Sequence, residues 1–290
     1  MSEPRTEAKM PRPWSAARRQ AAQMRLCLLF YLGLGAPGVR RTYPECRLRA
    51  AAGRAPDLVR DLVALYRGEG DAGAGTVETI NFRSAAVTPA GGREKFFVKE
   101  FPRGHAWHDV ERALRCSRVD RAWRAAHLLP RLGILTPRAV GAAVTRAPDG
   151  APLEFLVTEW LERGIPYHLR LRAVSDDTEA RRGLLEAFGD ELRRWHDRGI
   201  YLRDLVKNVL TRESDGGMEY WLTDLDQIHP GRRVTRSRVL HQMRQLARRC
   251  GPLAAEEARA IVGHYLGTTR GRTAEAIEEA LLTAEPAEPA

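Results

Sequence analysis

Three oxygen-bearing side chains stand close together in the second half of the chain, in a pattern that suits phosphoryl transfer. Asp204 and Asn208 lie on a short polar stretch that follows a helical pattern, and Asp224 ends an aromatic-rich strand pattern. Carboxylate and amide oxygens are ligands that magnesium takes in proteins, and a nearby carboxylate can accept the proton of an attacking hydroxyl. The sequence therefore predicts one metal-dependent site assembled from both segments.

The residues around these three side chains resemble the motifs of protein-kinase-like enzymes. Asp204 and Asn208 lie in R-D-L-V-K-N, which resembles the catalytic loop H-R-D-L-x-x-x-N, and Asp224 lies in T-D-L-D, which resembles the D-F-G position in its sugar-kinase form. The loop is one residue shorter than is usual in these enzymes. Leu202 stands where the first His is usual.

A predicted strand upstream carries a candidate phosphate ligand. Lys99 lies in F-V-K-E, which is similar to the V-A-I-K strand of the same enzymes. The helical segment that follows, from Ser117 to Pro137, resembles the corresponding segment of bacterial lipopolysaccharide-core sugar kinases. Its central turns contain no Glu to pair with Lys99, while Asp120 lies near its start and Glu111 lies upstream. An unpaired Lys is less well positioned, so activity is expected to be reduced or unusual.

The resemblance covers the chain from about Ile80 to Leu266. It implies an α+β fold with two lobes, in which an antiparallel β N-lobe lies over a helical C-lobe and the active site lies between them. It also implies an ATP- and magnesium-dependent phosphotransferase similar to the lipopolysaccharide kinases (Kdo/heptose kinases). Such an enzyme transfers the γ-phosphate to a sugar hydroxyl of the lipid A core.

The same resemblance assigns roles to individual residues. Asp204 would orient and deprotonate the hydroxyl, Asn208 and Asp224 would hold magnesium, and Lys99 would hold the phosphates. The backbone at Glu159 and Leu161 would meet the adenine, so that neither side chain needs to be special.

An arginine-rich segment follows the predicted metal site. Arg232, Arg233 and Arg236 lie where an acceptor would dock, and guanidinium groups would suit an anionic acceptor. The alternative for these arginines is a solvated loop. His196, about one helical turn before Gly199, is interpreted as a structural hydrogen-bonding residue, because Asp204 already supplies the base.

Two other functions stay open at this point. A fold does not name its acceptor, so the chain is alternatively a kinase for another small molecule or for a protein. The shorter loop and the missing helix Glu favour a second alternative, a pseudokinase that binds a nucleotide or a partner without turnover.

The chain of 290 residues, 43% of them hydrophobic, is long enough for one substantial core. We expect a basic extension over residues 1–75, with a helix near 56–67, an N-lobe over 76–162 and a C-lobe over 163–290. Residues 1–60 carry twelve Lys or Arg against four Asp or Glu, while the whole chain has a net charge of +10. This basic arm suits an anionic membrane surface, and a solvated extension is the alternative. No nucleic-acid partner is expected, because aromatic interleaving and a binding motif are lacking.

The compartment is predicted from what the chain lacks. No apolar run reaches the roughly 18–20 residues that span a bilayer. The four Cys are scattered without C-x-x-C spacing or His partners, which favours a reducing cytosol. Leu26 to Val39 resembles a signal-peptide core, but export would separate the enzyme from ATP. We therefore expect a cytoplasmic protein at the inner face of the membrane. Three other interpretations of this arm stay open: a segment at the membrane surface, a helix docked on the lobe, or a later start at Met10 or Met24.

Periodicity and capping residues predict the main elements. Five strands between residues 76 and 160 are expected to form the small lobe. Helices are expected after the caps Ser117 and Asp177, with Gly199 ending the second. Further helices are expected around residues 239–250, 253–266 and 273–283.

Overall fold

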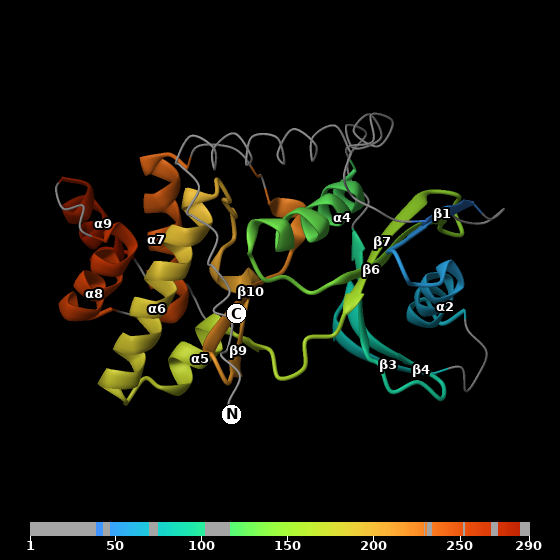
Figure 1. Cartoon of the computed structure of the whole chain (residues 1–290), viewed down its shortest axis with the longest axis horizontal. Coiled ribbons are helices and arrows are strands. Elements are labelled where there is room, and N and C mark those ends of the chain that lie inside the picture. The colour runs from blue at the N-terminus through green and yellow to red at the C-terminus, as the bar shows by residue number, and fades with distance from the viewer. Residues whose placement is uncertain are drawn as a thin grey trace, which may run out of the picture.

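The computed structural model describes residues 39–42, 47–69, 75–101, 117–228, 230, 234–251, 253–267 and 272–284. These residues form two lobes (Figure 1). One lobe is a twisted sheet that carries helix α2, and the other contains helices α5 to α9. After strand β7 the chain passes from the sheet to the helical lobe.

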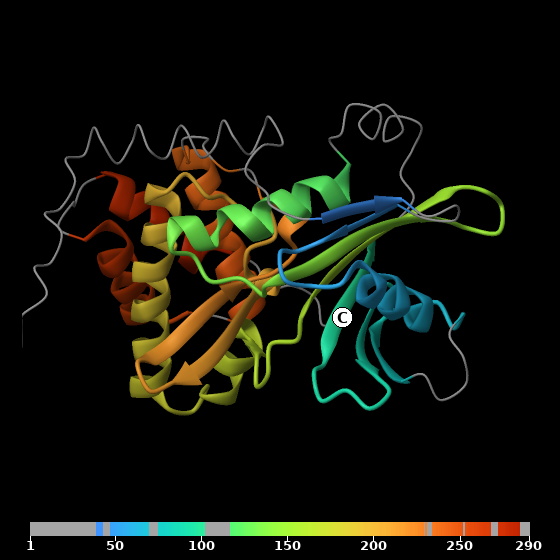
Figure 2. The same cartoon turned by 45° about the vertical axis from the view of Figure 1, so that its right-hand side comes forward.

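The small lobe is built on an antiparallel sheet whose strand order is β1-β2-β6-β7-β5-β4-β3. Its strands are β1 (Val39–Thr42), β2 (Arg47–Ala50), β3 (Gly75–Asn81), β4 (Ser84–Pro89), β5 (Phe96–Phe101), β6 (Ala139–Arg146) and β7 (Pro152–Glu159). The five strands predicted between residues 76 and 160 are present as β3 to β7. The expectation that these five alone form the small-lobe sheet is wrong, because β1 and β2 also belong to it. Two short strands from the arginine-rich region before residue 51 extend the sheet: β2 pairs with β6, and β1 pairs with β2 (Figure 2).

Helix α2 (Pro56–Tyr66) covers one face of this sheet. Its buried side chains pack against the inward residues of the strands, among them Phe96 and Val98. The helix approaches β6 closely at Gly141, where a Cβ atom would collide with the side chain of Val59. Glycine is therefore required at this contact, because any larger residue would push the helix off the sheet.

Helix α4 (Arg118–Leu128) lies against the other face of the sheet, next to the large lobe (Figure 2). Ser117 caps it as predicted, since its side chain accepts a hydrogen bond from the backbone N–H of Asp120. The inward face of the helix includes Ala122 and Trp123, both fully buried. This face belongs to the same core as the large lobe, so α4 connects the two lobes through packing.

The large lobe packs its helices around a short antiparallel sheet with the order β10-β9-β8. Its elements are β8 (Ile165–Pro166), α5 (Tyr167–Ala173), α6 (Thr178–Asp197), β9 (Val209–Ser214), β10 (Gly217–Leu222), α7 (Arg236–Cys250), α8 (Ala255–Leu266) and α9 (Arg272–Leu282). Asp177 caps α6, and Gly199 follows the helix with a φ of 67°, a left-handed value that favours glycine. Both features agree with the predicted ends of this helix.

The arrangement confirms the predicted α+β class, with an antiparallel β lobe and a helical lobe. The boundaries at residues 75 and 162 stay predictions. The described part of the proposed extension supplies β1, β2 and α2 to the small-lobe sheet. Among the described residues, no helix is both long enough and apolar enough to cross a membrane.

Candidate active site

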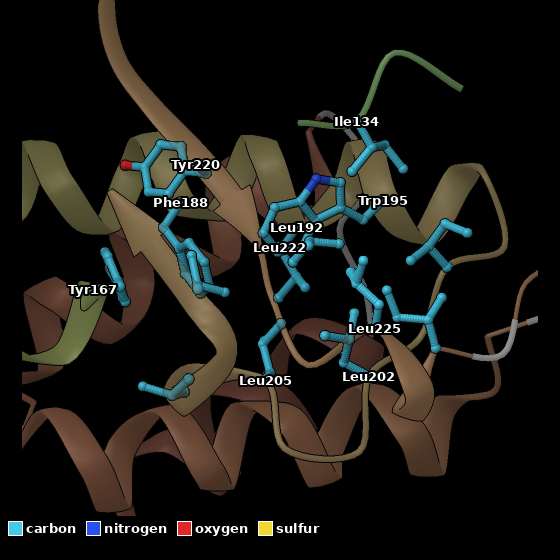
Figure 3. Close-up of a cluster of buried hydrophobic side chains, with 14 of the residues drawn as sticks. Ile134, Tyr167, Phe188, Leu192, Trp195, Leu202, Leu205, Tyr220, Leu222 and Leu225 are labelled. Carbon is cyan, nitrogen blue, oxygen red and sulfur yellow. The ribbon is translucent and has the colours of Figure 1, made fainter. Parts of the chain in front are cut away.

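The loop that carries Asp204 packs against the core of the large lobe through its leucine side chains. Leu202 and Leu205 are buried on either side of Asp204, which itself is exposed. Figure 3 shows both leucines near Leu222 and Leu225, the residues that flank Asp224. One apolar core therefore supports both motifs, and it leaves the polar residue of the loop at the surface.

Gln245, on helix α7, fixes the orientation of this loop. Its Oε1 accepts the backbone N–H of Leu205 at 3.2 Å, and its Nε2 donates to Asp204 Oδ1 at 3.3 Å. The Gln245 amide thus forms hydrogen bonds with two successive residues of the loop. This contact keeps the Asp204 carboxylate at a defined place on the loop.

The loop and the strand that ends at Asp224 are joined directly. The backbone N–H and the hydroxyl of Thr223 both donate to the carbonyl of Asn208, at 2.8 and 3.1 Å. The Asn208 side chain then donates to Asp224 Oδ2 at 3.3 Å. The four-step spacing from Asp204 to Asn208 is therefore compatible with Asn208 reaching the carboxylate of Asp224.

Asp224 adopts a left-handed backbone conformation, with a φ of 55°. Asp tolerates this region better than most residues, although it costs free energy. The conformation separates strand β10 from a single 3₁₀ turn over Leu225–Gln227. It also turns the carboxylate toward Lys99, which forms an ion pair with Asp224 Oδ1, while Gln227 Nε2 donates to Asp224 Oδ2.

Lys99 and Asp224 lie in different lobes, so this ion pair connects the two lobes at the candidate site. Burial lowers the pKa of the Lys99 ammonium, and the nearby Asp226 carboxylate opposes that lowering. Lys99 Nζ also lies 3.6 Å from Asp226 Oδ1. The second aspartate of the T-D-L-D segment is thus part of the same cluster.

Arg118, the first residue of α4, forms the other boundary of the cluster. Its Nε donates to Asp226 Oδ2 at 2.7 Å, and a second guanidinium nitrogen lies 2.6 Å from the same oxygen. Asp120, considered from the sequence as a partner for Lys99, instead forms an ion pair with Arg49 at 3.0 Å. Glu111 lies outside the described residues.

The predicted adenine segment follows strand β7. Strand pairing places Glu159 opposite Phe96 and Leu156 opposite Lys99, so the Glu159 side chain lies on the face away from Lys99. There it forms an ion pair with Arg54 at 2.6 Å. The backbone carbonyl of Leu161 accepts the N–H of Gly164 at 3.2 Å in the turn that follows. The expectation that only the backbone of this segment meets a base stays a prediction.

The arginines predicted to bind an acceptor are only partly described. Arg236 is exposed at the first turn of α7, whereas Arg232 and Arg233 lie outside the described residues. Two residues after Arg236, the Arg238 guanidinium lies 5.0 Å from the ring centre of Tyr201. Burial raises the pKa of the Tyr201 hydroxyl, the charges of Arg238 and Arg203 oppose this rise, and Asp204 adds to it. Positive charge therefore lies beside the Asp204 loop.

The donor set fits magnesium better than a metal that needs a complete protein cage. Among the described residues, no group of three or more His, Cys, Asp and Glu side chains is arranged to hold a metal. Asp224 and Asn208 supply two oxygens, and magnesium sites of kinases are completed by phosphates and water. These two residues would hold the ion, which would neutralise charge on the phosphates.

His196, near the end of α6, has the structural role expected from the sequence. Its Nε2 lies 2.5 Å from Gln242 Oε1, its Nδ1 lies 2.8 Å from the Tyr265 hydroxyl, and Gln242 Nε2 donates to the carbonyl of Leu202 at 2.7 Å. Burial lowers the pKa of His196 to about 4. The neutral imidazole thus connects α6, α7 and the Asp204 loop.

This network predicts a loss of stability in mild acid. Above pH 6.5 His196 is neutral in both the folded and unfolded states, while between pH 6.5 and about 4 only the unfolded state takes up the proton. The free energy of unfolding should therefore fall by about 1.4 kcal/mol per pH unit across this window. Denaturation of wild type and His196→Gln at several pH values measures the difference in slope. Equal slopes for wild type and His196→Gln would contradict the prediction.

Taken together, a lysine from a β lobe, two polar residues from a helical lobe and a carboxylate on an adjacent loop define a phosphotransferase of the kinase type. The family model of the lipopolysaccharide kinase (Kdo/WaaP) family matches residues 74–265 of this chain. The chain belongs to that family, and it is a kinase.

The solved structures that are similar to this chain include the following two. One is WaaP in complex with acyl carrier protein, with 18% sequence identity, a TM-score of 0.48, and coverage of 67% of this chain and 79% of that one. The other is a double mutant of the Mycobacterium tuberculosis PknI kinase domain, with 16% identity, a TM-score of 0.41, and coverage of 72% and 94%. No curated protein sequence matches the chain significantly.

The structure adds residues that the sequence did not single out as functional, namely Arg118, Asp226, Gln227 and Gln245. One of them carried a usable signal. The helix dipole disfavours a cation at the first turn, so an Arg directly after the cap of α4 indicates an anionic partner elsewhere. The identity of that partner could not be predicted from local sequence.

Proposed function

We propose that this kinase uses ATP and magnesium to phosphorylate a sugar hydroxyl of the lipid A core. The observation that carries the proposal is the cluster in which Lys99 and Asn208 both contact the carboxylate of Asp224, next to the loop of Asp204. Family membership supports a sugar acceptor of this type.

In this proposal each residue has a separate task. Lys99 binds the phosphates, and Asn208 and Asp224 orient the metal that neutralises their charge. Asp204 accepts the proton of the sugar hydroxyl as its oxygen attacks the γ-phosphorus and ADP leaves. Gln245 holds the Asp204 carboxylate in place through its 3.3 Å hydrogen bond.

The basic residues beside the loop support an anionic acceptor. Arg203 and Arg236 are exposed, and Arg238 is held against Tyr201. Guanidinium groups recognise phosphate and carboxylate groups well, because their planar donors match both oxygens. With Arg232 and Arg233, these residues would orient the acceptor toward Asp204.

The direct test uses the complete chain. Calorimetry measures the affinity for a non-hydrolysable ATP analogue with and without magnesium, and phosphate transfer is measured on lipid A-core, on other sugars and on protein acceptors. We expect magnesium-dependent binding and transfer to lipid A-core. Transfer to a protein alone would contradict the proposed acceptor, and nucleotide binding without any transfer across this panel would favour a pseudokinase.

The proposed site of action is the inner face of the cytoplasmic membrane, where the basic arm would bind anionic lipid. Residues 1–38 contain six Lys or Arg and two Asp or Glu. Deleting them should weaken binding to anionic liposomes, since each basic residue near such a surface contributes about 1 kcal/mol. The deletion ends at residue 38 because β1 and β2 belong to the sheet. A role in lipid binding would be contradicted if the full chain and the deletion sedimented equally with anionic liposomes. It would also be contradicted if the deletion reduced sedimentation with neutral liposomes by the same amount as with anionic ones.

A further inference from the structure

Lys99 lies between two carboxylates, and only one of them is positioned as a metal ligand. Its Nζ forms an ion pair with Asp224 Oδ1 and lies 3.6 Å from Asp226 Oδ1. A carboxylate that coordinates a metal has fewer lone pairs left for an ammonium group. Lys99 therefore needs a second anionic partner whenever Asp224 turns to the metal.

Asp226 is held rigidly enough to be that partner. Its side chain is only 2% exposed, and its Oδ2 accepts two nitrogens of Arg118 at 2.6 and 2.7 Å. Its Oδ1 is buried, and none of the described residues donates a hydrogen bond to it. A buried carboxylate oxygen without a donor is costly, so a shift of Lys99 toward Asp226 would gain a charge-assisted hydrogen bond.

Helix α4 offers no carboxylate for the same purpose. Ala122 lies one turn after Arg118 on the same face of the helix, where it is fully buried and carries no polar group. Asp120 is already paired with Arg49. The helix contributes a cation to the cluster at Arg118, and the turn after Asp224 contributes the anion.

We infer that Asp226, anchored by Arg118, is the positioning residue that holds Lys99 once Asp224 binds the metal. In protein kinases a Glu on the helix beside the sheet pairs with this lysine. Here the helix supplies the cation Arg118 instead, and the turn after Asp224 supplies the anion Asp226. This inference rests on the proposed function, because it concerns Lys99 and Asp224 in their nucleotide-bound roles.

Asp226→Asn tests the inference through the magnesium dependence of nucleotide binding. The variant leaves Asp224 as the anionic partner of Lys99, so that Lys99 competes with magnesium for this carboxylate. We expect the magnesium concentration for half-maximal binding of a non-hydrolysable ATP analogue to rise about tenfold, the lower end of the effect of losing support around a metal ligand. Calorimetry over a magnesium series measures it.

A second substitution separates this role from a purely structural one. Lys99→Met in the Asp226→Asn background removes the competing ammonium, so the magnesium requirement should return toward the wild-type value while nucleotide affinity stays weak. Structural damage would not be repaired in this way. Arg131→Gln, an exposed arginine just after α4, is the matched control and should leave the magnesium requirement unchanged.

The single variant leaves the Arg118 guanidinium without its anion and could unfold. Asp226→Asn combined with Arg118→Gln removes both charges, which costs less than leaving one unpaired, and should show the same increase. A wild-type magnesium requirement in these variants would overturn the inference and leave the proposed function standing. Failure of wild type to bind the analogue at any magnesium concentration would overturn both.

Discussion

Asp204→Asn is expected to keep the nucleotide affinity of the wild type and to lose phosphoryl transfer by about 10²- to 10⁴-fold, the contribution typical of a general base. The amide keeps the shape of the carboxylate but cannot take the proton of the acceptor hydroxyl. The loop should keep its conformation, because Leu202 and Leu205 anchor it in the core. The nucleotide contacts proposed for Lys99 and Asp224 lie elsewhere in the cluster.

The measurement compares two quantities in the same preparations: affinity for the ATP analogue by calorimetry, and the rate of phosphate transfer to lipid A-core. Asp176→Asn, at an exposed position before α6, is the matched control and should behave like wild type. Full transfer activity in Asp204→Asn would remove Asp204 from the catalytic role. A parallel loss of affinity and rate would instead assign it to nucleotide binding.

Asp224→Asn is expected to abolish magnesium-dependent turnover while the protein stays folded. The change removes the negative charge of the proposed metal ligand, so the loss should exceed about 10³-fold, the upper end for removing one electrostatic group. The fold should persist, because Asn tolerates the left-handed conformation found here at a φ of 55°. Lys99 keeps Asp226 as an anionic neighbour at 3.6 Å.

The test measures turnover across a magnesium series, together with thermal unfolding. Asp215→Asn, in the exposed turn of the β9–β10 hairpin, changes the same residue type in the hairpin that leads to Asp224 and should have no effect. Turnover in Asp224→Asn that matches wild type at any magnesium concentration would refute Asp224 as the metal ligand. A collapse of the melting temperature would show a structural role instead.

The secondary structure of this chain could largely be predicted from its sequence. Ser117 and Asp177 cap the helices that they were expected to cap, and the helix expected around residues 239–250 is present as α7. Caps and hydrophobic periodicity act over a few residues, so the local sequence contains the information. Lys99, Asp204 and Asp224 could be singled out for a similar reason, since the chemistry requires particular side chains next to recognisable strands and turns.

The tertiary structure decided which of these groups meet. Lys99 and Asp224 are 125 residues apart, Arg118 and Asp226 are 108 apart, and Gln245 is 40 residues beyond the backbone group that it holds. No periodicity extends over such separations. Partner choice depends on how α4 and the strands pack between the lobes, and this packing results from the summed burial of many side chains.

The two extra strands follow the same rule. Strands β1 and β2 are four residues long and contain two Arg each, so their local sequence lacks the longer alternating apolar run that predicts a strand. The edge of β6 has backbone groups that need hydrogen-bond partners, so β2 pairs with it, and β1 then pairs with β2. The sequence by itself determined the elements and the reactive side chains, whereas the edge of β6 and the packing of α4 decided the extent of the sheet and the partners of Lys99.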